Sequence, residues 1–292
     1  MSDPQPTGYY GRPVIRPPEW TALIPIYFFA GGFAGAAATI ACAERLSGNE
    51  RLARTMLLGA AGSAGVSAFC LIADLKRPER FLNMLRVFKP TSPMSVGVYI
   101  FSAFGGAVSV AAASEITGIA PRLGNVAAAA AAVIGPMMSV YTGVLIGDTV
   151  VPAWYGARKT LPVLFAATSA ASAGGYGLLL CRADAAGTAR RLALLGGLAV
   201  PIALARLETE AGDVTRRAYK DGRAGRLAKA ARLLTTAGTA AAALSRFRPS
   251  LGRAAGAMLL GASLLERFAI FEAGAASARD PRYVVENQRR LE

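Results

Sequence analysis

Long apolar segments alternate with short polar ones along almost the whole chain. Eight stretches each run for about 20 mostly apolar residues, the length that an α-helix needs to cross the hydrocarbon core of a bilayer. The predicted spans are residues 21–43, 55–75, 94–115, 125–147, 161–181, 190–206, 230–245 and 253–273. The sixth and seventh are the weakest, because charged residues flank or interrupt both. We therefore predict an all-α integral membrane protein with eight transmembrane helices, arranged as two four-helix bundles.

The ends of the chain lack this pattern. Prolines interrupt residues 1–20 at three sites, and proline blocks helix formation. No basic stretch followed by an apolar run occurs there, so we expect no cleaved signal peptide. We divide the chain into an extended N-terminal tail at 1–20, a transmembrane domain at 21–274 and a C-terminal tail at 275–292.

Composition and charge agree with a membrane location. The chain is 53% hydrophobic and 17% charged, with a mean hydropathy of +0.39 and a net charge of +14. Most basic residues cluster at the ends of the apolar segments, so the charge indicates membrane topology rather than nucleic-acid binding. Eight spans put both termini on one side, where 21 of the 32 Lys and Arg residues fall, against 10 on the other. This asymmetry predicts that both termini are cytoplasmic.

The chain has few residues that could hold a redox cofactor. It has no histidine, and its three cysteines, Cys42, Cys70 and Cys181, lie far apart. Haem b needs imidazole ligands, and iron–sulfur clusters need grouped thiolates. We therefore expect no haem and no iron–sulfur cluster in this chain, and we interpret the cysteines as small apolar side chains.

Polar residues that could carry chemistry concentrate at residues 74–99, between the second and third spans. Asp74 precedes Arg77 by about one helical turn, so the two could form an ion pair at the helix end, and Pro78 stops the helix. Alternatively, Asp74 is a carboxylate at the mouth of a polar pocket, where it moves protons or binds a head group. The residues alone leave both interpretations open.

This segment also resembles a known family. The sequence DLKRPERF at 74–81, followed by SPMS at 92–95, is similar to the NrfD/PsrC family, the membrane subunits of polysulfide-reductase-type respiratory oxidoreductases. Further similar stretches are YFFAGGFAG at 27–35, YTGVLIGDTVVPAW at 141–154 and FEAGAASARDPRYVV at 271–285. The resemblance implies eight helices in two four-helix bundles, which exchange electrons between a membrane quinone and a separate iron–sulfur subunit. It also implies a quinone site between the early helices, near the face that bears the N-terminus.

The implied site residues occupy positions that match the family pattern. In a family member, an asparagine and a histidine on the first helix, together with a later tyrosine, hold the quinone head group. The GGFAG glycines align Tyr27 with the histidine and Ile24 with the asparagine, so both polar residues are replaced, and Tyr141 matches the later tyrosine. We predict a site for menaquinone or ubiquinone in which a tyrosine hydroxyl donates a hydrogen bond to a quinone carbonyl. The predicted quinone-binding residues are Tyr27, Tyr141, Asp74 and Arg77.

Two carboxylates are predicted catalytic residues, because two-electron quinone chemistry needs proton routes. They are Asp74 and Asp148; Asp148 ends the fourth span, where the alternative is an exposed helix-end carboxylate. Trp154 follows it and is interpreted as a residue of the interfacial aromatic belt. Glu266 and Arg267 lie inside the last span and need partners from other helices, so we expect an inter-helix ion pair, with a proton pathway as the alternative.

The tails and the basic 76–92 loop are expected to dock a partner protein. Both tails emerge on the side of this loop, carry aromatic residues and are too short to fold alone, so we predict that they order on an iron–sulfur subunit; disordered tails are the alternative. The predicted docking residues are Arg80, Arg86, Lys89, Tyr10, Arg282 and Tyr283. The arginines and the lysine of the loop could also meet lipid phosphate.

These observations lead to one main hypothesis. The chain would be the membrane anchor and quinone-reactive subunit of a multi-subunit respiratory oxidoreductase in the bacterial inner membrane, and alone it would catalyse nothing. The resemblance implies two partners, a ferredoxin-like iron–sulfur subunit and a molybdopterin-type or related catalytic subunit. The alternatives are a secondary transporter or ion channel, whose polar residues would line a midplane site, and an anchor that has lost its quinone site.

Overall fold

The computed structural model describes residues 15, 17–182 and 185–283, without the side chain of Arg80. Helices account for most of this part of the chain, and each predicted span falls on one of them. In chain order they are α1 (Leu23–Leu46), α2 (Glu50–Ala73), the 3₁₀-helix η1 (Pro78–Leu85), α3 (Pro93–Thr117), α4 (Pro121–Gly147), α5 (Pro152–Gly156), α6 (Leu161–Leu180), α7 (Gly187–Lys220), α8 (Gly222–Leu244) and α9 (Ser250–Arg279).

Local sequence explains several helix boundaries. The side chain of Asn49 accepts a hydrogen bond from the backbone N–H of Leu52 and caps α2, and proline occupies the first turn of α3 and of α4. Gly118 ends α3 with a φ of +72°, a conformation that glycine adopts without strain. The predicted span at 190–206 corresponds to the longer α7, whose regular geometry breaks at Gly212, where φ is +70°.

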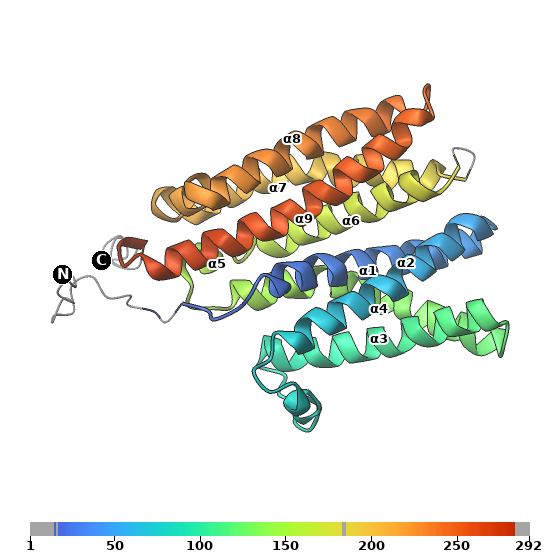
Figure 1. The fold of residues 1–292 in the computed structure, drawn as a ribbon, viewed down its shortest axis with the longest axis horizontal. Coiled ribbons are helices and arrows are strands. Elements are labelled where there is room, and N and C mark those ends of the chain that lie inside the picture. Colours follow the sequence, from blue (N-terminus) through green and yellow to red (C-terminus); the bar gives the residue numbers. More distant parts are fainter. Residues whose placement is uncertain (1–14, 16, 183–184, 284–292) are drawn as a thin grey trace, which may run out of the picture.

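The long helices form two groups (Figure 1). Helices α1 to α4 pack against one another in succession, and α6 to α9 do the same. The groups meet where α1 and α4 pack against α6 and where α1 contacts α9. The start of α1, the end of α2, η1 and the end of α9 lie at one end of the molecule, here called the tail end. The α1–α2, α3–α4, α6–α7 and α8–α9 turns lie at the opposite end, here called the far end.

Seven helices of the described chain are long and apolar enough to cross a membrane: α1, α2, α3, α4, α6, α7 and α9. The exception is α8, because its first half carries four basic residues, Arg223, Arg226, Lys229 and Arg232. It still packs along α9, and Glu208 of α7 forms ion pairs with Arg232 and, at 2.9 Å, with Lys220. The protein is therefore an all-α, multi-pass membrane protein with seven clear spans in the described residues, one fewer than the sequence predicts.

Small residues allow α1 and α4 to cross in close contact. A Cβ atom on Gly35 would lie 2.2 Å from the Gly135 carbonyl oxygen, so no larger side chain fits there without a shift of the backbone. Two hydroxyls bond across the same crossing: Thr39 donates to the Ala132 carbonyl at 3.1 Å, and Ser139 donates to the Gly32 carbonyl at 3.1 Å. Such packing and hydrogen bonding drive helix association in a bilayer, where apolar contact alone gives little preference.

Candidate functional site

A cavity of about 120 Å³ lies among α1 to α4 and η1 at the tail end. Nine of its lining residues are apolar and three are polar: Trp20, Ile24, Phe28, Leu71, Leu75, Met84, Met94, Val98 and Leu145, with Tyr27, Asp74 and Tyr141. An apolar protein cavity of about 150 Å³ can hold benzene. The cavity therefore has the size of a single ring, with a few polar groups on its wall.

Two tyrosines bring phenol groups to the cavity wall. Tyr27 of α1 and Tyr141 of α4 are buried, with 2% and 9% of their surfaces exposed. Neither phenol hydroxyl has a hydrogen-bond partner in the part of the chain that the structure describes. By contrast, the hydroxyl of Tyr219 donates to the Ala153 carbonyl at 2.7 Å. Both cavity hydroxyls are therefore available to a ligand.

The ring of Tyr141 packs in the space that the absent side chain of Gly97 leaves. A Cβ atom on Gly97 of α3 would lie 2.4 Å from Cε2 and 2.8 Å from Cδ2 of the Tyr141 ring. Carbon atoms ordinarily pack about 3.5–4.0 Å apart. The ring therefore lies directly against the backbone of α3, and any side chain at position 97 would displace it.

Asp74 joins the end of α2 to the start of α1. Its Oδ1 accepts two hydrogen bonds from Thr21, one from the backbone N–H at 3.0 Å and one from the hydroxyl at 2.5 Å. Thr21 lies two residues before α1, next to the N-terminal turn where backbone donors lack partners within the helix and the helix dipole favours negative charge. Asp74 Oδ2 has no hydrogen-bond partner among the described residues, so this oxygen can serve a ligand at the cavity.

Of the two interpretations of Asp74, the ion pair with Arg77 is wrong. Helix α2 ends at Ala73, and Arg77 has the non-helical angles φ −137° and ψ 85°, because the residue before a proline is driven out of the helical region. Arg77 is exposed and does not line the cavity. Asp148 directly follows α4, is also exposed and likewise lies outside the lining. The cavity thus gathers three of the five predicted site residues and leaves these two outside.

Several cavity residues were not predicted from the sequence. Met84 comes from η1, Met94 from the first turn of α3, and Trp20 from the residues before α1. Methionine is flexible and fills irregular apolar space, so these two side chains can adapt to a ligand. The sequence offered one indication of both methionines, which is that they lie within the polar 74–95 segment.

The prediction that Trp154 belongs to an interfacial belt is wrong. Its side chain is fully buried, and its Nε1 donates to the Ile270 carbonyl of α9 at 2.8 Å. Its ring stacks on Trp20, with 5.6 Å between centroids and 20° between planes. A Cβ atom on Gly274 would overlap the same ring, so α9 is shaped to receive it. Trp154 therefore supports a wall of the cavity from behind.

Arg267 of α9 is buried, but its partners are not carboxylates. Its Nη2 donates to the Phe165 carbonyl at 3.0 Å and to the Ser169 hydroxyl at 3.2 Å, and its guanidinium lies 3.5 Å from the centroid of the Phe165 ring. Its Nε and Nη1 have no partner in the described structure. No ion pair among the described residues includes Glu266 or Arg267, so the expected inter-helix ion pair is replaced by bonds from Arg267 to α6.

The predicted docking residues are only partly covered by the structure. Arg86, Lys89 and Arg282 are exposed, and Tyr283 is partly buried against the core. Tyr10 and the side chain of Arg80 lie outside the described residues. Their roles in docking stay predictions.

The helices that form the cavity all lie within the residues that a family model matches. Residues 16–209 match the model described as polysulphide reductase, NrfD. The chain belongs to the NrfD family. The NrfD match includes α1 to α6 and the 74–95 segment, and confirms the predicted family, while the similar stretch at 271–285 lies beyond it. NrfD proteins are membrane subunits of respiratory oxidoreductases and work with iron–sulfur and catalytic subunits. The comparison with curated proteins found no match.

Proposed function

We propose that this NrfD-family protein is the quinone-reactive membrane subunit of a respiratory oxidoreductase, and that the tail-end cavity receives the quinone head group. The observation that carries the proposal is the cavity itself. Tyr27, Tyr141 and Asp74 line an apolar space the size of one ring, and among the described residues neither phenol hydroxyl nor Oδ2 of the carboxylate has a hydrogen-bond partner. The family match supports an oxidoreductase subunit over a transporter or ion channel.

The cavity matches the head group rather than a whole prenylated quinone. Pockets that enclose a drug-sized ligand have volumes of about 300–1,000 Å³, several times this one. The ring would enter between α1 to α4, and the isoprenoid tail would stay in the lipid. Met84 and Met94, which line the cavity, can change rotamer to make room for the ring.

The residues around the ring have distinct roles in this proposal. The hydroxyls of Tyr27 and Tyr141 donate hydrogen bonds to quinone carbonyl oxygens and fix the orientation of the ring. When a quinol is oxidised, its two electrons pass to the iron–sulfur subunit, and Asp74 Oδ2 takes up the two protons one after the other from the quinol hydroxyls and releases each to water at the tail end. In the reverse direction, Asp74 takes each proton from water and delivers it to the reduced quinone.

Electrons pass to or from the iron–sulfur subunit, which we place over the tail end. There the exposed side chains of Arg86 and Lys89 follow η1 and the exposed Arg282 follows α9. We further propose that α8 also lies in the membrane, which gives eight spans in two four-helix bundles, and that the tail end faces the cytoplasm of a bacterial cell. The partners would be a ferredoxin-like subunit and a molybdopterin-type or related catalytic subunit.

Two nearly isosteric substitutions test the site. Asp74→Asn removes the proton carrier, and Tyr27→Phe removes one donor, so each should lower quinone-linked turnover of the assembled complex by about 10- to 100-fold. Turnover is measured with a soluble quinone in membranes, and assembly by co-purification of the partner subunits.

Matched controls lie outside the cavity. Tyr176→Phe and Asp213→Asn remove the same chemical groups from α6 and from α7, and both should retain wild-type turnover. Unchanged turnover in Asp74→Asn and Tyr27→Phe, with the complex assembled, would remove the proposed site.

A further inference from the structure

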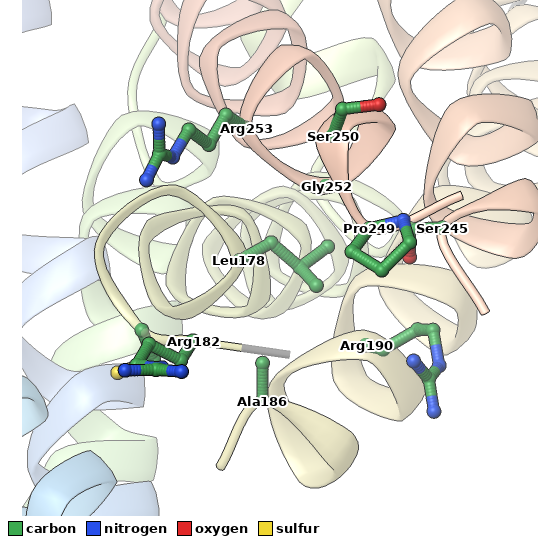
Figure 2. Close-up of a pocket in the computed structure, with 10 residues that line it drawn as sticks. Leu178, Arg182, Ala186, Arg190, Ser245, Pro249, Ser250, Gly252 and Arg253 are labelled. Atoms are coloured by element: carbon green, nitrogen blue, oxygen red, sulfur yellow. The ribbon is translucent and has the colours of Figure 1, made fainter. Parts of the chain in front are cut away.

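A larger cavity lies at the far end, between the α6–α7 turn and the α8–α9 turn. Its volume is about 480 Å³, and three arginines line it: Arg182, Arg190 and Arg253. Figure 2 shows Arg182 and Arg253 on one side and Arg190 on the other, with the apolar side chains of Leu178 and Pro249 between them. The walls are therefore cationic and the floor is apolar.

The positive charge of this cavity is not neutralised by the described chain. Within residues 17–182 and 185–283, none of the three arginines forms an ion pair or a side-chain hydrogen bond. Two other arginines at the far end are paired: Arg45 bonds Glu115 at 2.5 Å, and Arg54 lies 3.7 Å from the same carboxylate. Arg51 and Arg122 have no ion pair among the described residues either, but they line neither far-end cavity, so this cavity differs in gathering three unpaired arginines.

A second basic cavity adjoins the first. Its volume is about 570 Å³, it shares Arg190, and it adds Arg191 and Arg246. The two turns, residues 181–191 and 244–253, contain six arginines and a single carboxylate, Asp184, which lies outside the described residues. Five of these six arginines line the two cavities; the sixth, Arg248, does not.

These arginines stand on the side of the membrane that carries fewer positive charges. With the termini at the opposite end, this side holds 10 of the 32 basic residues, and six of the ten belong to the two turns. Positive charges are disfavoured on a translocated side. Because their positive charges concentrate around one pair of cavities, we expect a negatively charged ligand there.

Exposed apolar side chains surround the same turns. Leu180, Leu244 and Phe247 expose 57%, 54% and 79% of their surfaces. Leu180 ends α6, a clear span, and Leu244 and Phe247 lie at and just after the end of α8, which the proposed function places in the membrane, so both helices leave the hydrocarbon core here. A ligand that fits here carries negative charge at one end and an apolar chain at the other.

We propose that the far-end cavity binds the phosphate head group of an anionic phospholipid, with its acyl chains beside α6 and α8. Arginine forks match phosphate oxygens, and basic pockets between transmembrane helices bind anionic head groups. The first turn of α9 adds a helix N-terminus to the same cavity, which favours an anion in addition to the arginines. This inference does not depend on the quinone site.

Native mass spectrometry of the full chain in detergent, titrated with phosphatidylglycerol, tests the proposal. Arg182→Gln/Arg253→Gln should weaken phosphatidylglycerol binding by about 25-fold, a factor of about five for each charge removed. Arg182→Lys/Arg253→Lys keeps both charges and should retain most of the affinity, which separates loss of the site from loss of folding. Phosphatidylcholine, which has no net charge, should bind weakly to every variant.

The matched control is Arg51→Gln/Arg122→Gln, which removes two exposed arginines from the same end but outside both cavities. It should bind phosphatidylglycerol as the wild type does. An equal loss of phosphatidylglycerol affinity in this control would overturn the site, because binding would then depend only on the total positive charge of the far end. Inorganic phosphate that competes with phosphatidylglycerol at equal concentration would overturn the lipid assignment in favour of a free anion.

Discussion

Gly97→Ala tests the geometry of the tail-end cavity through a residue outside its lining. The new methyl carbon would lie 2.4 Å from Cε2 of Tyr141, whereas carbon atoms ordinarily pack about 3.5–4.0 Å apart. The ring must therefore move by about 1 Å or more. Its hydroxyl moves with it.

The expected loss follows from this displacement. A hydroxyl donor bonds an oxygen acceptor over about 2.5–3.0 Å, so a shift of about 1 Å breaks a bond to a quinone carbonyl. Misplacement of this size can cost about 100-fold in rate. We expect kcat/KM for quinone to fall by about 10- to 100-fold. Alanine favours the helix over glycine by about 1 kcal/mol, so the complex should still assemble.

The assay is quinone-linked turnover of the assembled complex, and α3 itself supplies the control. A Cβ atom on Gly105 meets nothing within 4 Å, so Gly105→Ala brings the same helix preference without the clash and should keep wild-type turnover. The double variant Gly97→Ala/Tyr141→Phe should be no slower than the slower single variant, since both changes act on one hydroxyl. Wild-type turnover in Gly97→Ala, or losses that multiply in the double variant, would refute the reasoning.

Three further changes test other contacts. Gly35→Ala places a methyl group 2.2 Å from a backbone oxygen of α4. It should lower the free energy of unfolding by about 1–3 kcal/mol, measured as a lower Tm in detergent. Gly62→Ala, with open space around its Cβ, should leave the Tm unchanged. Arg267→Lys loses the planar guanidinium that donates a hydrogen bond to α6 and should lower the free energy of unfolding by about 1–3 kcal/mol. Arg226→Lys, at an exposed position, should lower it by no more than about 0.5 kcal/mol. Equal Tm values for the two variants would contradict this. Thr21→Val removes one of the two hydrogen bonds that Asp74 accepts, so quinone-linked turnover should fall, but less than in Asp74→Asn. A larger fall in Thr21→Val than in Asp74→Asn would contradict this.

The positions of the helices were predictable because they depend on local sequence. Each span is a run of apolar residues, and its ends are set by nearby residues such as Pro93 and Gly118. The conformation of Arg77 was also within reach, because proline follows it and restricts its backbone. An i,i+3 ion pair between Asp74 and Arg77 requires a helix that continues to Arg77, and the proline at position 78 excludes it.

Contacts between distant segments were not predictable in this way. The partner of Asp74 is Thr21, 53 residues earlier, and nothing in the neighbouring sequence of either residue identifies the other. The burial of Trp154 depends in the same way on α9, and a tryptophan just after a span has the same local sequence whether it faces lipid or protein. The meeting of Tyr27 and Tyr141 was anticipated through the family resemblance, because hydropathy does not report which faces of two helices oppose each other.

The cavity belongs to α1 to α4, but the second group of helices holds one of its walls. Trp20 lines the cavity and stacks on Trp154, whose Nε1 donates to the Ile270 carbonyl of α9. Helix α9 lies beyond the residues that match the family model, yet it fixes the ring behind the cavity. The proposed head-group site therefore depends on both groups of helices, and the Trp20–Trp154 stack, one of several contacts between them, lies at the tail end, beside the loop proposed to dock the iron–sulfur subunit. In the proposed complex, docking at this end would reach the quinone through η1, which supplies Met84 to the cavity, without any change in the far half of the bundle.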